Sequence, residues 1–348
     1  MTNLLISKFG LIFFSSFLSF LTSLILAPKL IRGLKYFQFN TTIKEETIMN
    51  HKTPIYNKLH KKKEGTPTMG GILIWVTTAI FCIGSLVLQN FEITNFSLIN
   101  REETYLPLFT LITFGLLGMV DDIFGIKKIG KVKGLSAKTK ITWLIMLSLV
   151  GGIWFNQKLG YDSINFFGNV ITIGKFYVPL FMFVIIGSAN AVNFTDGLDG
   201  LAGGLTILAF LSYALVCYFK GLSLLMTLCV IIASTTAGFL WYNIPPAKFI
   251  MGDTGSLALG GTLGVIACLT DTIFLLPFVG FIFVIETLSV IIQLTSKKFF
   301  QRKVFLVAPI HHHFEALGWP EFKVTMRFWI IGIYIASLGL LIHFFQNY

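Results

Sequence analysis

The sequence predicts an all-α polytopic membrane protein with about ten transmembrane helices, cytoplasmic catalytic loops and one membrane domain over residues 1–348. Hydrophobic residues make up 55% of the chain and charged residues only 12%, which excludes an ordinary soluble domain. Ten apolar runs approach the length that crosses a bilayer as a helix. Basic residues gather in alternate connecting segments, as they do in helical membrane proteins.

The ten apolar runs define the expected spans in chain order. They lie near residues 4–27, 70–88, 104–120, 141–156, 176–192, 201–219, 222–240, 256–270, 272–295 and 327–345. The fourth and eighth runs are short and can extend into their loops. The first run is too long for a cleaved signal peptide, so we interpret it as the first span. The four cysteines lie inside apolar runs without a CxxC pair, which favours packing thiols over a metal site or a disulfide.

The distribution of Lys and Arg predicts the orientation. Segments 28–69, 121–140, 241–255 and 296–327 contain 22 of the 27 basic residues, whereas the alternating segments and the N-terminus contain five. The positive-inside rule then places the basic segments in the cytoplasm and both termini outside. Because the net charge of +11 follows this alternation, it indicates membrane orientation and not nucleic-acid binding.

Segment 190–204 is the most unusual polar stretch. It places Asn193, Asp196 and Asp199 among four glycines, between two apolar runs. This spacing puts the two carboxylates and the amide on one side of a helix entrance. A turn that only connects two spans does not need such a set, although helix capping by aspartate is an alternative explanation.

Further polar clusters fall on the same side of the membrane. Those that follow the third, fifth, seventh and ninth runs are Asp121 with Asp122, Asp196 with Asp199, Asp253, and His311 with His312 and His313. The alternation of spans therefore predicts one composite cytoplasmic site. Converging carboxylates repel one another unless a cation lies among them, and Mg²⁺ with one or two carboxylates and substrate phosphates satisfies this requirement. Lys63 and the basic loops add positive charge for an anionic substrate.

The segment 243–256 supports this hypothesis. Pro245 and Pro246 end a helix, and Gly252 and Gly255 flank Asp253 and allow close approach of the backbone to a ligand. Asp253 then lies at the start of the eighth span, where we expect free N–H groups that favour phosphate.

Two further features have open interpretations. Adjacent histidine side chains diverge, so we expect one phosphate-contacting and two structural histidines in the run that begins at His311. Glu286 lies well inside the ninth run, with Gln293 two turns further along the same face. An intramembrane acid is usually functional or paired, and both a structural hydrogen bond and a role at the site fit Glu286.

Several segments, in this order along nearly the whole chain, resemble one family. They are 65–71 (GTPTMGG), 121–122 (DD), 134–138 (GLSAK), 193–200 (NFTDGLDG), 251–256 (MGDTGS) and 309–315 (PIHHHFE). The chain is similar to the polyprenyl-phosphate N-acetylhexosamine-1-phosphate transferase superfamily. The first and last segments favour its phospho-N-acetylmuramoyl-pentapeptide-transferase branch.

The resemblance implies a ten-helix inner-membrane enzyme of bacteria. It would transfer phospho-MurNAc-pentapeptide from its UDP carrier to undecaprenyl phosphate and yield lipid I and UMP with Mg²⁺. By motif, Asp253 would be the principal Mg²⁺ ligand, with Asp121 and Asp122 catalytic and also candidate ligands. His311 would act at the phosphate or sugar. The residues implied in substrate binding are Lys63, Thr68, Asn193, Asp196, Asp199, Asn243, Gln293, His312 and His313. A homodimer in the bilayer is compatible with this expectation.

Two departures from the family pattern concern the site. Members usually have Phe directly before Met-Gly-Asp, where this chain has Ile250 with Phe249 one residue earlier. Members often have Lys three residues after the second Asp of the pair, where this chain has Gly125, so Lys127 or Lys128 is the expected substitute.

Two rival functions differ in what they predict. An ion- or proton-coupled transporter predicts acids near the middle of the membrane and related halves, whereas the acids here lie at the ends of runs. A sister transferase with another UDP-sugar predicts the same site and differs only in the substrate it accepts.

Overall fold

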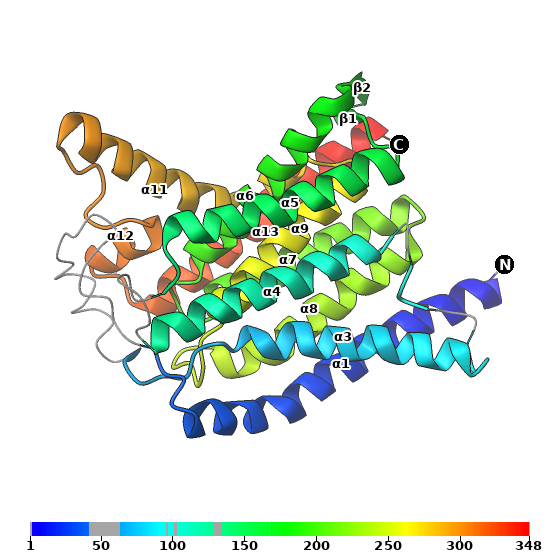
Figure 1. Ribbon diagram of the computed structural model, residues 1–348, viewed down its shortest axis with the longest axis horizontal. Helices are drawn as coiled ribbons and strands as arrows, with labels where there is room; N and C mark the ends of the chain where they lie inside the picture. The colour runs from blue at the N-terminus through cyan, green and yellow to red at the C-terminus, as the bar shows by residue number, and fades with distance from the viewer. Residues whose placement is uncertain are drawn as a thin grey trace.

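The protein is a bundle of long helices, described here from a computed structural model. The structure describes residues 2–41, 63–94, 97–100, 103–127, 134–166 and 168–347. The helices that run along the bundle are α1 (Thr2–Tyr36), α3 (Gly71–Asn90), α4 (Tyr105–Ile126), α5 (Ala137–Lys158), α6 (Tyr177–Thr195), α7 (Leu201–Phe219), α8 (Ser223–Asn243), α9 (Asp253–Leu269), α11 (Phe281–Phe300) and α13 (Glu321–Asn347). Figure 1 shows both chain termini at one end of the bundle and α12 (Ile310–Ala316) at the other.

The predicted helical membrane fold is confirmed. Within the described ranges, eight helices are long and apolar enough to cross a bilayer, and α9 is a shorter apolar helix of 17 residues. The exact count of ten spans stays a prediction, because α11 falls outside that set. The expected ninth run is divided into α10 (Leu276–Val279) and α11, which separate at Gly280. Pro277 near the start of α10 and Gly280 explain this break, since both residues weaken a continuous helix.

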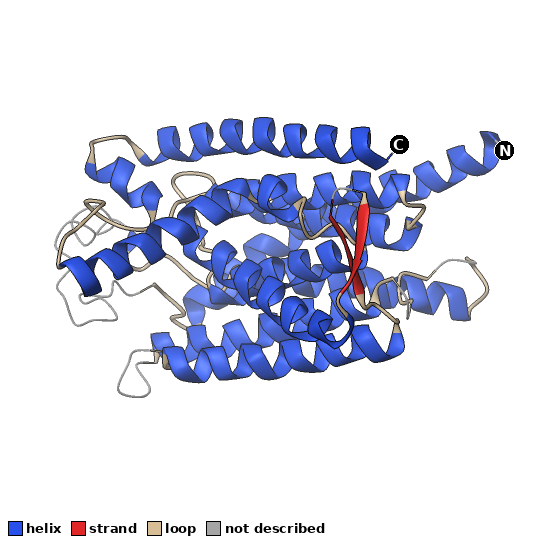
Figure 2. Cartoon of the chain, turned by 90° about the horizontal axis from the view of Figure 1, so that it is seen from above, coloured by secondary structure: helices blue, strands red, loops and turns tan. Residues whose placement is uncertain are grey.

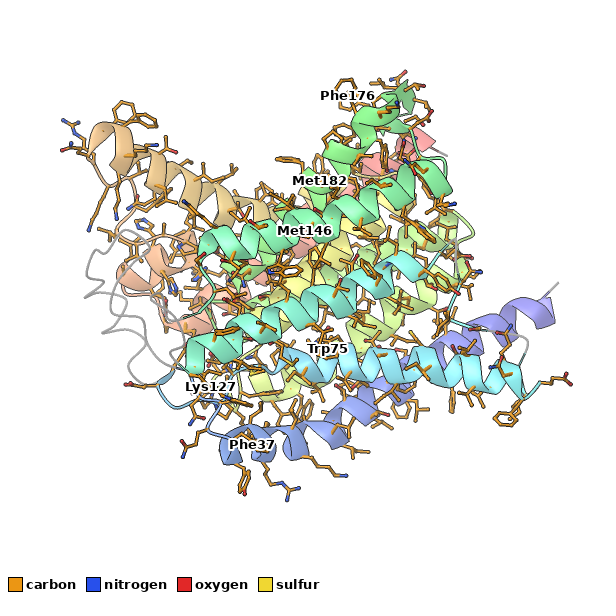
Figure 3. The ribbon with its side chains drawn as sticks, viewed as in Figure 1. Phe37, Trp75, Lys127, Met146, Phe176 and Met182 are labelled. Atoms are coloured by element: carbon orange, nitrogen blue, oxygen red, sulfur yellow. The ribbon has the colours of Figure 1, made fainter. Side chains whose placement is uncertain are left out.

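One small β-element occurs in the described ranges. Strands β1 (Ser163–Phe166) and β2 (Asn169–Thr172) pair antiparallel between α5 and α6, with Ser163 opposite Thr172. Figure 2 shows this hairpin toward the end of the bundle that holds both termini. Figure 3 places Phe176, which begins the approach to α6, beside the same hairpin. The hairpin is therefore far from the polar clusters that the sequence singles out.

Helix α9 is the centre of the bundle. Every residue from Thr254 to Leu269 is buried, and α3, α4, α6 and α7 pack around it. Small residues allow this close packing, as they do in other membrane bundles. A Cβ at Gly260 would lie 2.4 Å from the Ser188 carbonyl oxygen of α6. The buried position of α9 fixes its first residue, Asp253, against three neighbouring helices.

Candidate active site

The first turn of α9 is held by an aspartate from another helix. Asp122 of α4 accepts hydrogen bonds from the Asp253 N–H at 3.3 Å, the Thr254 N–H at 3.0 Å and the Thr254 hydroxyl at 2.6 Å. These contacts overturn one prediction, because the first two N–H groups of α9 are not free for phosphate. The physical reason is that Asp122 caps α9 across a helix interface, which no pattern within 243–256 can reveal.

The Asp253 carboxylate lies between an amide and an ammonium group. Asn193 of α6 donates to Asp253 Oδ1 at 2.7 Å and to the Ser256 hydroxyl at 2.9 Å. Lys140 of α5 donates to Asp253 Oδ2 and is also 2.7 Å from Asp121 Oδ2. One lysine therefore bridges two of the predicted aspartates, and it was not among the predicted site residues.

Both carboxylate oxygens of Asp121 have hydrogen-bond donors. Its Oδ1 accepts the Leu135 N–H at 2.7 Å, while its Oδ2 faces Lys140. The Asp121 side chain is 12% exposed and that of Lys140 is 19% exposed. The pair thus joins the end of α4 to the first turn of α5, in a partly desolvated setting that strengthens the interaction.

The donor atoms at this centre suit Mg²⁺. Asp121 and Asp253 already hold a cationic group between them, and hard carboxylate oxygens are the protein ligands that Mg²⁺ prefers. No cluster of three or more His, Cys, Asp or Glu side chains that could hold a metal occurs in the described part of the chain. A Mg²⁺ ion here would therefore need phosphate or water oxygens besides two carboxylates, which is its usual arrangement.

Glycines bring three backbones together beside Asp253. A Cβ at Gly118 of α4 would lie 2.1 Å from the Asp253 carbonyl oxygen, and one at Gly71 of α3 would lie 2.2 Å from Gly255. A Cβ at Gly252, which has φ +73°, would meet Asp122 and the Thr68 hydroxyl at 2.6 and 2.8 Å. The buried Thr68 thus lies beside Gly252 at this centre, and its substrate-binding role stays a prediction.

The turn between α6 and α7 binds the 247–253 segment at separate points. Asp196 Oδ2 accepts the Gly252 N–H at 3.0 Å, and Asp199 Oδ2 accepts the Ala247 N–H at 2.9 Å. Asn193 contacts Asp253 instead. The three polar side chains of this stretch therefore diverge along the neighbouring segment, although the sequence predicted that they share one side of a helix entrance.

Lys63 has two carboxylate partners. Its ammonium group lies 2.8 Å from Asp199 Oδ1 and 2.5 Å from Glu321 Oε1 at the start of α13. Burial lowers the pKa of Lys63, but the charges of Glu321 and Asp199 outweigh it and leave the pKa above its ordinary value. Lys63 is therefore cationic at neutral pH. Glu321 was not predicted at the site.

Asp196 has an unfavourable electrostatic setting. Burial raises its pKa well above the ordinary value, the Gly252 N–H opposes that shift, and the charge of Asp253 adds to it. The carboxyl therefore tends to hold its proton in the free protein.

The histidine run forms the short helix α12, which packs on the same turn. His311 is completely buried, and its Nδ1 lies 3.0 Å from Oε2 of the equally buried Glu286. A Cβ at Gly197 would lie 2.3 Å from His311 Nε2 and 3.2 Å from His312 Nε2. Glycine is thus required at position 197, and the pairing with α12 accounts for the acid inside α11.

The remaining predicted residues bind backbone groups or neighbouring acids. His312 contacts Glu315 at 2.7 Å, and His313 accepts the Leu306 N–H at 3.2 Å. Gln293 binds both backbone groups of Phe305, at 2.9 and 3.0 Å. These contacts hold the 301–309 segment and α12 against α11.

Asn243 performs a similar task in the loop that precedes α9. Its side chain is buried, accepts the Gly200 N–H at 3.0 Å and donates to the Phe249 carbonyl at 2.9 Å. The turn after α6 is thereby tied to the segment before Asp253. A substrate-binding role for Asn243 stays a prediction.

The structure shows where the residues at the two departures from the family pattern lie. Phe249 is fully buried and packs on Phe239 with ring centroids 4.8 Å apart, so its ring is not open to a nucleobase. Lys127 is exposed at the end of α4 (Figure 3), and Lys128 lies outside the described residues. Among the described lysines, Lys140 has the position beside the aspartates that Lys127 was expected to take.

Comparisons with known proteins show the family of this chain. Residues 104–271 match the glycosyl transferase family 4 model, and residues 63–74 match signature 1 of phospho-N-acetylmuramoyl-pentapeptide-transferase. Relatives with that name are 40% identical in Geobacillus sp. (93% of this chain, 95% of the relative) and 39% identical in Staphylococcus carnosus (95% and 98%). Another, from Thermodesulfovibrio yellowstonii, is 40% identical over 97% of this chain and 94% of its own. The chain therefore belongs to the phospho-N-acetylmuramoyl-pentapeptide-transferase family and is an enzyme of the glycosyl-1-phosphate transferase class.

Proposed function

We propose that this enzyme transfers phospho-MurNAc-pentapeptide from UDP-MurNAc-pentapeptide to undecaprenyl phosphate, giving lipid I and UMP in bacterial peptidoglycan synthesis with Mg²⁺. The main support from the site is the carboxylate pair of Asp121 and Asp253, which holds a cationic group at the head of the buried α9. Because this pair can hold a cation, and because the Lys63 ammonium lies on Asp199 in the turn between α6 and α7, the site suits a reaction between anionic phosphates.

Asp253 and Asp121 are the residues that would hold Mg²⁺. When bound, the ion supplies positive charge for the diphosphate and for the phosphate that leaves as UMP. Asn193 fixes one oxygen of Asp253, and Asp122 fixes the first turn of α9 on which Asp253 stands. We therefore assign Asp122 a positioning role, because its oxygens already accept three hydrogen bonds.

Direct attack by the lipid phosphate is the mechanism that we favour. A phosphate monoester has a second pKa of about 6, so it is mostly a dianion at neutral pH and has little proton for a base to remove. Both oxygens of Asp121 have donors, one from Leu135 and one from Lys140. A carboxylate held in this way is better suited to orient Lys140 and a metal ion than to act as a base or a nucleophile.

Turnover tests this proposal most directly. Purified enzyme with Mg²⁺ and undecaprenyl phosphate should release UMP from UDP-MurNAc-pentapeptide and should do so far faster than from UDP-N-acetylglucosamine. The opposite preference would identify the sister transferase. No UMP release from either donor would contradict both assignments.

We further propose that the site faces the cytoplasm of the bacterial inner membrane. Helix α12, which packs on the turn after α6, lies at the bundle end opposite both termini (Figure 1), and the 22-to-5 split of basic residues favours that end as cytoplasmic. Reporter fusions after Asn90 and after Lys131 should report opposite sides, with the second inside. The same side for both fusions would refute the orientation.

A further inference from the structure

Glu321 binds the same donors that an anionic ligand would use. It is the first residue of α13, 258 positions from Lys63 along the chain. Its Oε1 accepts hydrogen bonds from the Lys63 ammonium and from the Asp199 N–H, both at 2.5 Å. An ammonium group and a backbone N–H that converge on one oxygen are typical of phosphate binding.

The two carboxylates on Lys63 are not equally fixed. Asp199 is 9% exposed, and its second oxygen accepts the Ala247 N–H. The Glu321 side chain is 23% exposed, and the hydrogen bonds that it accepts from the described residues go to Oε1. Glu321 also has one more rotatable bond than Asp199. Separating Glu321 from Lys63 therefore costs less free energy than separating Asp199 from Lys63.

The charge balance makes that departure necessary for anion binding. One ammonium with two carboxylates has a net charge of −1, which does not attract a diphosphate. Once Glu321 turns away, Lys63 and Asp199 are neutral together, and the Lys63 ammonium and the Asp199 N–H are both free to donate.

We propose that Glu321 is a releasable counter-ion that competes with a phosphate group of the substrate for Lys63 and the Asp199 N–H. This inference rests on the proposed function, because it takes the nucleotide-linked diphosphate as the competing anion. In the free enzyme Glu321 keeps the Lys63 head group in place. During binding it lowers the apparent affinity, so it sets the substrate concentration at which the site fills.

Substitution of Glu321 by glutamine tests the competition. Glutamine keeps the size and loses the charge, so Lys63 is held less strongly. We expect Glu321→Gln to bind UDP-MurNAc-pentapeptide about fivefold more tightly at equilibrium without lipid phosphate, which is within the range of a partly exposed ion pair. The KM for this donor should fall in parallel while kcat changes little. Unchanged or weaker binding would overturn the proposal and identify Glu321 as an orienting residue.

Two controls separate this effect from general electrostatics. Glu64 is exposed and adjoins Lys63 in the chain, so Glu64→Gln removes the same charge nearby and should leave the affinity unchanged. In a Lys63→Met background the Glu321→Gln substitution should lose its effect, as a double-mutant cycle requires of two groups that interact directly. An equal gain in the presence and absence of Lys63 would refute competition for that lysine.

Inorganic diphosphate, as a second probe, separates failure of this inference from failure of the proposed function. Tighter diphosphate binding by Glu321→Gln that depends on Lys63 would support the counter-ion even if the enzyme did not turn over the proposed donor. The absence of that gain would overturn the inference even in an enzyme that made lipid I. Thermal unfolding of each variant confirms that the fold is intact.

Discussion

The substitution Asp121→Asn discriminates best among the mechanisms open to this site. Asparagine keeps the size of the side chain, and its oxygen can still accept the Leu135 N–H. Its amide group, however, presents a donor to Lys140, which is itself only a donor. The variant therefore removes one carboxylate from the Lys140 bridge and leaves Asp253 as the remaining partner.

The size of the effect follows from the geometry of that bridge. The distance of 2.7 Å and exposures of 12% and 19% place the Asp121–Lys140 pair between a surface and a buried ion pair. A hydrogen bond to a charged group contributes about 1.5–3 kcal/mol. If that energy is lost from the transition state, kcat/KM should fall roughly ten- to 150-fold. Asp162→Asn, an exposed acid before β1, is the matched control and should retain full activity.

The pH profile then decides between roles. If Asp121 orients charge, raising the pH from about 7 to 9 should not restore Asp121→Asn, because a phosphate of pKa about 6 is already ionised. Substantial rescue over that range would refute our argument and support a base. A phospho-MurNAc adduct on the enzyme, formed without lipid phosphate, would refute it differently and establish a covalent route.

Three further predictions address the metal, the packing and the pH dependence of stability. Asp253→Asn should raise the Mg²⁺ concentration needed for half-maximal activity, and near-normal activity at limiting Mg²⁺ would count against this assignment. Gly118→Ala should cost about 1–3 kcal/mol of stability by overpacking against the Asp253 carbonyl, whereas Gly33→Ala, with open space around it, should be neutral or stabilising in thermal unfolding. Because the folded pKa of Asp196 lies above its unfolded value, Asp196 contributes stability at low pH that is lost as the pH rises through the folded pKa. The gain in melting temperature of Asp196→Asn over wild type should therefore be larger at pH 8 than at pH 5, and an equal or smaller gain would show that Asp196 is ionised in the folded protein.

The helical fold and the gathering of the acids at one end could be predicted from the sequence. Run length and the alternation of basic loops depend only on local composition, which the bilayer converts into helices and their order. The break in the ninth run also had a visible signal, because Pro277 and Gly280 stand three residues apart inside it. The β1–β2 hairpin had a weaker signal, since its strands are only four residues each.

The partners of the charged residues could not be predicted in the same way. Lys140 lies two positions after the recognised GLSAK segment, yet its contact with Asp253 spans 113 residues. Glu321 and the Glu286–His311 pair depend likewise on how α13 and α12 rotate against distant turns. Side-chain pairing of this kind is set by tertiary packing, so a sequence pattern can indicate that an intramembrane acid needs a partner but not which one it finds.

An aspartate at this site can cap a helix and also contribute to the arrangement of the proposed catalytic residues. An ordinary N-cap comes from the residue before the helix, and its loss frays that helix alone. Here the cap of α9 is Asp122, which lies 131 residues from Asp253 in the chain and beside Asp121. The same contact therefore ties the last turns of α4 to the first turn of α9 and sets the separation of Asp121 from Asp253. A structural cap in this position affects the proposed metal site, because any shift of α9 relative to α4 changes the spacing of the Asp121 and Asp253 carboxylates that we propose as Mg²⁺ ligands.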